Sequence, residues 1–189
     1  MRPGSAGGCC RDFIKEGLMK IRQALPEELP KILELYRDAR AYMAAQGNPT
    51  QWKDGYPSSA LVERDIGAGC CMVCEADGAL AGVFSCLPGP DPTYAVIEDG
   101  AWPNDLPYGV IHRICVRIHQ KGVASFCFSY ALEKYKNLRI DTHRDNIPMQ
   151  KALRKNGFTR CGIIHLENGE ERIAFSSSLD STAADNVRC

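Results

Sequence analysis

The residues between 116 and 125 have the composition of an anion-binding turn. The run Val116-Arg117-Ile118-His119-Gln120-Lys121-Gly122-Val123-Ala124-Ser125 follows an apolar, β-branched stretch and precedes a helical pattern. Gly122 lets the backbone approach a ligand closely, and the first turn of a helix leaves its N–H groups without partners. Each amide contributes about 1.5–3 kcal/mol toward an anion, and the helix dipole contributes about 0.3–1 kcal/mol. A pyrophosphate suits this turn, although the motif by itself is equally typical of an ordinary helix start.

A second segment, about twenty residues downstream, makes the first more specific. From Asn146 it reads Asn-Ile-Pro-Met-Gln-Lys-Ala-Leu-Arg-Lys-Asn-Gly-Phe, ending at Phe158. This resembles the pattern of the GNAT acyltransferases, which have Asn, a small or apolar residue three positions on, an aromatic seven positions on, and then KxGF. Seven residues fit this motif or the family's upstream Q/R-x-x-G-x-G/A turn: Asn146, Met149, Lys155, Gly157, Phe158, Gly122 and Ala124.

The resemblance implies acetyl-CoA as cosubstrate, with no metal, in a cleft where strands ending near Val116 and Thr142 separate. The backbone of Ile114, Cys115 and Val116 would pair with the pantetheine arm. Asn146 would reach the cofactor from the following helix. The pyrophosphate would be held by the turn, whose residues are Gln120, Lys121, Gly122, Val123, Ala124 and Ser125.

The sequence also departs from the family pattern. His119 stands where the family has Gln or Arg, and the turn is about two residues short. Leu153 occupies the position of the usual catalytic tyrosine and cannot protonate a leaving thiolate. Two functions therefore stay open: an N-acetyltransferase that acts on a primary amine of a small molecule or peptide by direct attack, and a catalytically silent acyl-CoA-binding sensor. A single domain without an attached partner domain favours the enzyme.

Amine acylation needs a base, because a lysine-like amine lies about three pH units, or roughly 4 kcal/mol, from its neutral form at pH 7. His112 is the first candidate, since it precedes Val116 by four residues, where many relatives place a glutamate. The ordinary pKa of a histidine, near 6.5, is already close to neutral pH, so it can act as a base without a shift of its pKa. A buried histidine satisfied by neighbouring backbone is an equally good interpretation. Glu98 is the second candidate, with a surface carboxylate as its alternative.

Three residues between the first two expected helices are candidates for the acceptor pocket. Asn48, Trp52 and Tyr56 are placed there by the resemblance alone. Aromatic rings beside an amide suit a flat or cationic acceptor. A tryptophan in a loop more often anchors that loop to the core, and that interpretation is slightly favoured.

Periodicity predicts a mixed α/β fold with one mostly antiparallel sheet of about seven strands and about four helices. Antiparallel hairpins flank a strand–helix–strand unit whose strands are expected to be parallel. Helices are expected over 29–43, 123–135 and 147–156, and a further short helix is expected between a cap at Ser58 or Ser59 and the glycines at 67 and 69. Strands are expected over 20–25, 70–76, 80–87, 94–98, 108–116, 138–142 and 158–166 and near Phe175. Residues 19–176 would form the domain, 1–18 a disordered extension with Met19 as an alternative start, and 177–189 a polar tail.

Composition excludes several classes of protein. The 189 residues carry 23 basic and 23 acidic side chains, so no net field recruits nucleic acid or anionic lipid, and no apolar run is long enough for a membrane span. Five of the ten cysteines, namely Cys70, Cys71, Cys74, Cys86 and Cys115, fall in apolar strand-like runs, which indicates a reducing cytoplasm rather than disulfides. Cys71 and Cys74 form CxxC, but on a strand they face opposite ways, so a structural role is favoured over zinc. Whether the chain forms a homodimer stays open.

Overall fold

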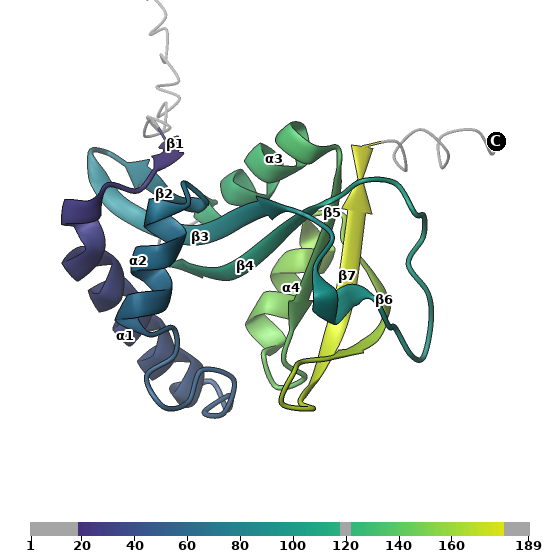
Figure 1. The fold of residues 1–189 in the computed structure, drawn as a ribbon. Helices are drawn as coiled ribbons and strands as arrows, with labels where there is room; N and C mark the ends of the chain where they lie inside the picture. The colour runs from purple at the N-terminus through teal and green to yellow at the C-terminus, as the bar shows by residue number, and fades with distance from the viewer. Residues whose placement is uncertain (1–18, 118–121, 180–189) are drawn as a thin grey trace, which may run out of the picture.

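A computed structural model describes residues 19–117 and 122–179. It contains one seven-stranded sheet with helices on both faces (Figure 1). The strands are β1 (Met19–Gln23), β2 (Cys71–Ala76), β3 (Ala79–Pro88), β4 (Gly109–Val116), β5 (Asn137–Thr142), β6 (Thr159–His165) and β7 (Glu171–Ser178). The helices are α1 (Leu29–Ala45), α2 (Ser59–Gly67), α3 (Val123–Tyr135) and α4 (Ile147–Lys155), with 3-10 turns η1 (Pro26–Glu28) and η2 (Pro92–Tyr94).

The strand order is β1-β2-β3-β4-β5-β7-β6, and β4 and β5 are the one parallel pair of neighbours among the described strands. These two strands pair at only two positions, Gly109 with Leu138 and Val110 with Arg139. Beyond Val110 they separate, so one edge of β4 has no strand beside it over the rest of its length. The predicted mixed sheet with a parallel central pair is confirmed.

Strand β4 also bends at a β-bulge, where the register with β3 shifts between Val83 and Ser85. Arg113 lies in the bulge with φ 54°, a left-handed conformation that costs a non-glycine residue roughly 1–2 kcal/mol. Its guanidinium donates to Asp65 Oδ2 from Nε at 3.1 Å and from Nη2, and the Ser85 hydroxyl donates to the same oxygen at 2.6 Å. This buried network fixes the bulge, and through it the direction in which β4 leaves β5.

Two apolar clusters pack on opposite faces of the sheet. One includes Phe84, Ile111 and Leu138 and packs against α3 and α4, while the other includes Val73 and Val83 and packs against α1 and α2. Cys74 belongs to the first cluster and Cys71 to the second, so the two cysteines of the CxxC face opposite ways as predicted. All seven described cysteines are free thiols, and six of them are buried.

Two boundaries predicted from sequence are wrong. Residues 94–98 do not form a strand, because Asp91 caps the η2 turn through the Thr93 N–H and only Glu98 bridges to Ile163. The boundary drawn after residue 176 falls inside β7, which continues to Ser178 because it pairs with β5 along its whole length. The extension 1–18 lies outside the described residues.

No helix in the described part of the chain is long and apolar enough to cross a membrane. Within residues 19–117 and 122–179, no group of three or more histidine, cysteine, aspartate or glutamate side chains is arranged to hold a metal ion.

Replacing Asp65 with alanine is expected to lower the free energy of unfolding by about 3 kcal/mol, because the variant leaves the buried Arg113 guanidinium without its counter-ion. Urea denaturation measures the change. Glu63→Ala, on the exposed side of the same helix, is the control and is expected to change stability by less than about 0.5 kcal/mol. Equal losses in the two variants would contradict a special role for Asp65.

Candidate functional site

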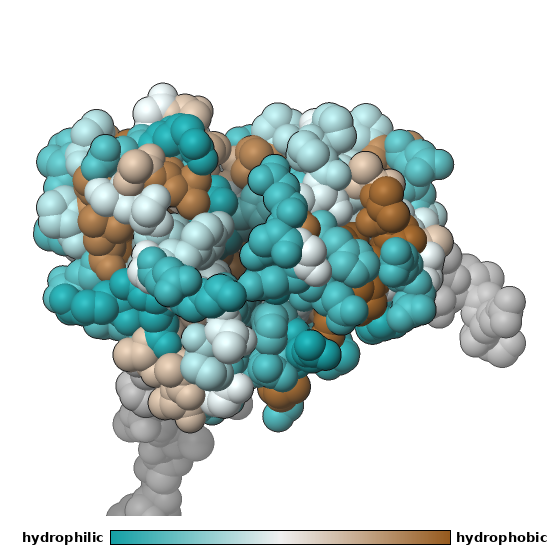
Figure 2. All heavy atoms as spheres, turned by 60° about the horizontal axis from the view of Figure 1, so that its bottom comes forward, coloured by the Kyte–Doolittle hydropathy of each residue, from teal (hydrophilic) through white to brown (hydrophobic). Residues whose placement is uncertain are grey.

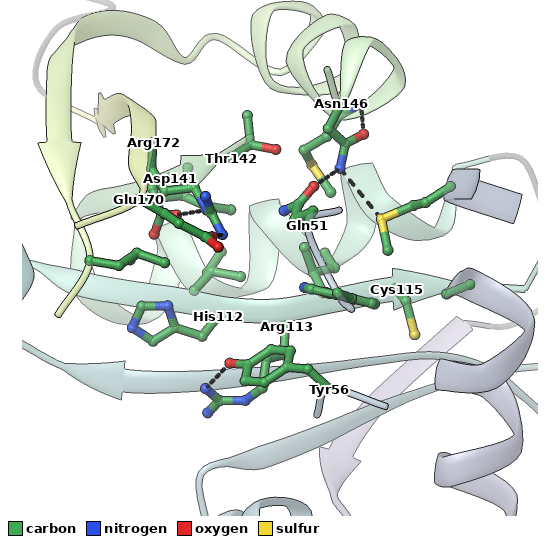
Figure 3. Close-up of a pocket in the computed structure, with 18 of the residues that line it drawn as sticks. Gln51, Tyr56, His112, Arg113, Cys115, Asp141, Thr142, Asn146, Glu170 and Arg172 are labelled. Atoms are coloured by element: carbon green, nitrogen blue, oxygen red, sulfur yellow. Dashed lines mark hydrogen bonds and ion pairs between the residues drawn. The ribbon is translucent and has the colours of Figure 1, made fainter. Parts of the chain in front are cut away.

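A cavity of about 1220 Å³ lies between the separated strands β4 and β5. The walls come from α1, the α1–α2 loop, β4, β5, the start of α4 and the β6–β7 turn (Figure 3). The mouth lies at the end of the molecule viewed in Figure 2, where polar side chains surround a hollow. The cavity exists because the sheet opens there, so both faces of the sheet contribute residues to it.

His112 lines the cavity from β4 on the α1–α2 face of the sheet. Its Nε2 lies 2.8 Å from Asp91 Oδ2, and its ring packs against Tyr94 with centroids 6.2 Å apart. The hydrogen bond from His112 lowers the pKa of Asp91 to about 2. Asp91 is therefore a carboxylate at neutral pH.

A charged cluster from β5, β7 and the β6–β7 turn lies beside His112 (Figure 3). The buried Tyr94 hydroxyl donates to Asp141 Oδ1 at 2.8 Å, and Arg172 Nε lies 3.9 Å from Asp141 Oδ2. Arg172 Nη2 also donates to Glu170 at 2.9 Å, and Lys53 Nζ lies 3.1 Å from the same carboxylate. These bonds, led by that from Arg172, lower the pKa of Glu170. The cations in this cluster are thus paired with protein carboxylates.

The α1–α2 loop is tied to α4 through Gln51. The Gln51 Oε1 accepts from Asn48 Nδ2 at 2.7 Å and from Asn146 Nδ2 at 2.8 Å. The Asn146 Oδ1 accepts in turn from the Met149 N–H at 3.2 Å and so caps α4. The side chain of Asn146 therefore fixes the helix start and the loop against each other at the cavity wall.

The residues on the α3 and α4 side of the cavity fit an extended ligand with a terminal anion. The unpaired edge of β4 offers backbone N–H and C=O groups from Ile111 to Val116. Gly122 has φ 86° and caps α3, whose first internal hydrogen bond runs from the Phe126 N–H to the Gly122 carbonyl at 2.9 Å. Among the described residues, the three preceding amides, of residues 123–125, have no acceptor, as is usual in the first turn of a helix, where such amides can bind an anion.

Most of the predicted site residues border this cavity. His112, Ile114, Cys115, Val116, Ala124, Asn146, Trp52 and Tyr56 line it. Gly122, Val123 and Ser125 form the start of α3 beside Ala124, and the Val123 side chain is buried in the core. Trp52 also packs edge-on against Tyr36, with centroids 5.6 Å apart, so it anchors its loop as well. Gln120 and Lys121 lie outside the described residues.

The predicted base Glu98 and the predicted acceptor residue Asn48 do not line the cavity. Glu98 is exposed, pairs through its backbone with Ile163, and does not line the cavity, because the segment that carries it crosses to β6. Asn48 is 2 % exposed and its amide faces Gln51 rather than the cavity, so its role is to hold the loop. The geometry of the cavity therefore favours other residues for the catalytic and acceptor-binding roles.

Leu153 is fully buried in the core under α4 and does not line the cavity. Thr142 borders the cavity at the end of β5, and its buried hydroxyl has no hydrogen-bond partner in the described residues. Leu138 and Ile140 alternate with it on the same face, toward α3 and α4. Asn146 is the other polar side chain on this wall, and its amide is committed to Gln51.

Sequence reasoning missed several residues of the site: Gln51, Asp91, Asp141, Thr142, Glu170 and Arg172. A signal existed for Asp91, since an aspartate before a proline commonly caps a turn. A signal also existed for Thr142, because it ends one of the two strands between which the cleft was expected. The pairing of Arg113 with Asp65 joins residues 48 positions apart, so no local pattern could indicate it.

Comparison with known proteins gives a consistent result. A model of the Acetyltransferase (GNAT) family matches residues 29–158. A GNAT-family acetyltransferase from Streptococcus agalactiae 2603 is 34% identical with TM-score 0.78, covering 85% of this chain and 95% of its own. A GNAT-family protein from Listeria monocytogenes 4b F2365 is 22% identical with TM-score 0.61, and the match covers 85% of this chain and 95% of the Listeria chain. AAC(6')-Ib, in complex with ribostamycin and coenzyme A, is 14% identical with TM-score 0.60, and the match covers 90% of this chain and 99% of the AAC(6')-Ib chain. A search of curated proteins finds no match.

Proposed function

The chain belongs to the GNAT acetyltransferase family, and from that premise we propose that it transfers the acetyl group of acetyl-CoA to a primary amine of a small molecule or peptide. The observation that carries the proposal is the separation of β4 and β5 after Val110, which leaves a through-passage in the sheet with His112 on one face. A protein of the same fold has been solved with coenzyme A bound, which supports the choice of coenzyme.

Acetyl-CoA fits the cavity with its pyrophosphate at the start of α3 and its pantetheine arm along the free edge of β4. The amides of residues 123–125 would meet the phosphates, and the backbone from Ile114 to Val116 would pair with the amides of the arm. The thioester then lies where the strands separate. The seven cysteines of the described residues are free thiols, which supports a reducing cytoplasm as the compartment.

The acceptor amine enters from the opposite face, beside His112, Tyr56 and Asp141. His112 takes one N–H proton as the nitrogen attacks the thioester carbonyl carbon and the C–N bond forms. The C–S bond then breaks and its electron pair leaves on sulfur. The Thr142 hydroxyl, on the α3 and α4 side, has no hydrogen-bond partner among the described residues and is proposed to hydrogen-bond the departing thiolate.

A catalytically silent acyl-CoA sensor is the second candidate, and buried Leu153 favours it, since no tyrosine stands at that position. Both candidates require coenzyme binding, and only the enzyme requires His112. Thioester cleavage measured against an amine panel separates them. Activity no higher than background in the parent protein, together with tight acetyl-CoA binding, would favour the sensor.

Gly122→Ala is expected to weaken acetyl-CoA binding about tenfold in titration calorimetry. A Cβ at φ 86° is strained, so the amides at the start of α3 would shift from their positions. Gly78→Ala is the matched control, because Gly78 has φ 76° in the distant β2–β3 turn and equally open surroundings. Both variants are expected to lose similar stability. Equal affinity in Gly122→Ala and Gly78→Ala would contradict the assignment of the pyrophosphate to this turn.

His112→Ala is expected to lower kcat about a hundredfold and to leave acetyl-CoA affinity unchanged, because a general base contributes on that order and the coenzyme lies on the other face. Steady-state kinetics at saturating amine measures the loss. Glu98→Ala is the control, expected to match the parent because its carboxylate lies outside the cavity. The reverse ranking of the two variants would restore Glu98 as the base.

Thr142→Val is expected to stabilise the protein by about 1 kcal/mol, because it removes a buried hydroxyl that has no partner in the part of the chain that the structure describes. The same change is expected to lower kcat about tenfold with little effect on KM, since the departing thiolate loses a hydrogen bond. Thermal unfolding and kinetics on one preparation test both effects. A variant that gains stability and keeps full kcat would exclude Thr142 from the reaction.

A further inference from the structure

The contact between Asp91 and His112 joins two elements far apart in the chain. Asp91 precedes the η2 turn, and His112 lies on β4, so the 2.8 Å contact from Asp91 Oδ2 to His112 Nε2 fixes the loop against the strand. Both side chains are mostly buried, with side-chain exposures of 14% and 23%. The pair therefore lies at the wall of the cavity with little competition from water.

The orientation of the Asp91 carboxylate is itself fixed. Its other oxygen, Oδ1, accepts from the Thr93 N–H at 2.9 Å and from the Thr93 hydroxyl at 2.6 Å. The two oxygens thus have different partners, one binding the turn and the other binding the imidazole. Tyr94, the next residue, packs its ring on His112 from the same turn. The turn as a whole holds the ring in place.

An ionised carboxylate can only accept hydrogen bonds. Because the Asp91 pKa is lowered to about 2, Nε2 of a neutral His112 must carry the proton that it donates to Asp91. Nδ1 is then the unprotonated nitrogen. It has no hydrogen-bond partner among the described residues, and His112 borders the cavity.

We propose that Asp91 is a positioning residue that selects the Nε2–H tautomer of His112, so that Nδ1 is the atom that takes the proton from the acceptor amine. This inference rests on the proposed function and adds the identity of the reacting atom. During attack, the amine lone pair forms the C–N bond and the Nδ1 lone pair takes an N–H proton. The other proton stays on Nε2 and keeps its hydrogen bond to the Asp91 carboxylate. That carboxylate stabilises the resulting imidazolium. Its extra proton passes to solvent, and water protonates the departing thiolate.

Other charged groups approach this pair from several elements. Asp141 of β5 lies beyond the Tyr94 hydroxyl, Arg172 of β7 is paired with Asp141 and Glu170, and the guanidinium of Arg113 is turned to Asp65. Among the hydrogen bonds and ion pairs of the described residues, the His112 ring makes one, with Asp91 Oδ2 as the acceptor. Asp91 is thus the group placed to decide the tautomer.

Asp91→Asn tests the inference, because the asparagine amide can donate to Nε2 and so favour the opposite tautomer. The first readout is the ¹⁵N spectrum of the His112 imidazole in the free protein, assigned with His112→Gln. The parent is expected to show protonated Nε2 and bare Nδ1, and Asp91→Asn to show a shift toward protonated Nδ1. The second readout is kcat, expected to fall about a hundredfold with acetyl-CoA affinity unchanged.

Asp99→Asn is the matched control, since Asp99 is exposed, lies outside the cavity, and has φ 51°, which asparagine tolerates well. It is expected to keep the parent spectrum and kcat. A parent spectrum with protonated Nδ1, or an Asp91→Asn variant with parent spectrum and parent kcat, would overturn the inference. If the parent protein lacks activity, the proposed function fails while the spectrum still decides the tautomer.

Discussion

The short pairing of β4 with β5 is the constraint on which the rest of the site depends. Two paired positions hold the halves of the sheet together, and beyond Val110 the strands separate. The bulge at Arg113, fixed by Asp65 and Ser85, bends β4 at that point. If β4 and β5 paired along more of their length, the cavity would close, and the backbone N–H and C=O groups on this edge of β4 would be hydrogen-bonded to β5. The open edge is thus a structural cost that a bound ligand can offset.

The passage through the sheet separates two kinds of chemistry. The face covered by α3 and α4 presents backbone donors, apolar side chains and the Thr142 hydroxyl, which suit a long ligand bound mainly by its main-chain-like amides. The other face presents His112, Asp91 and Asp141, which suit proton transfer and a cationic group. A reaction at the passage would therefore use a base on one side and release the leaving group on the other.

Elements with strong periodicity could be predicted closely from sequence: α3 has the predicted limits, and β2 and β3 lie within one residue of theirs. The residues of the proposed coenzyme wall could be named from the two motifs, because the groups that they offer are largely backbone atoms placed by local turns. The acceptor wall did not, because Asp91, Asp141 and Arg172 come from three separate elements that tertiary packing brings together. Glu98 was misplaced for the same reason, since a capped turn took the place of the predicted strand.

The central claim is that the free edge of β4 receives the coenzyme arm. Hydrogen exchange measured residue by residue, with and without acetyl-CoA, tests it most directly. The account predicts that exchange slows at the cleft-facing backbone amides of residues 111–116 and in the first turn of α3, while β1 and β6 at the sheet edges are unchanged. Slowing confined to other parts of the chain, or no slowing at saturating coenzyme, would contradict it.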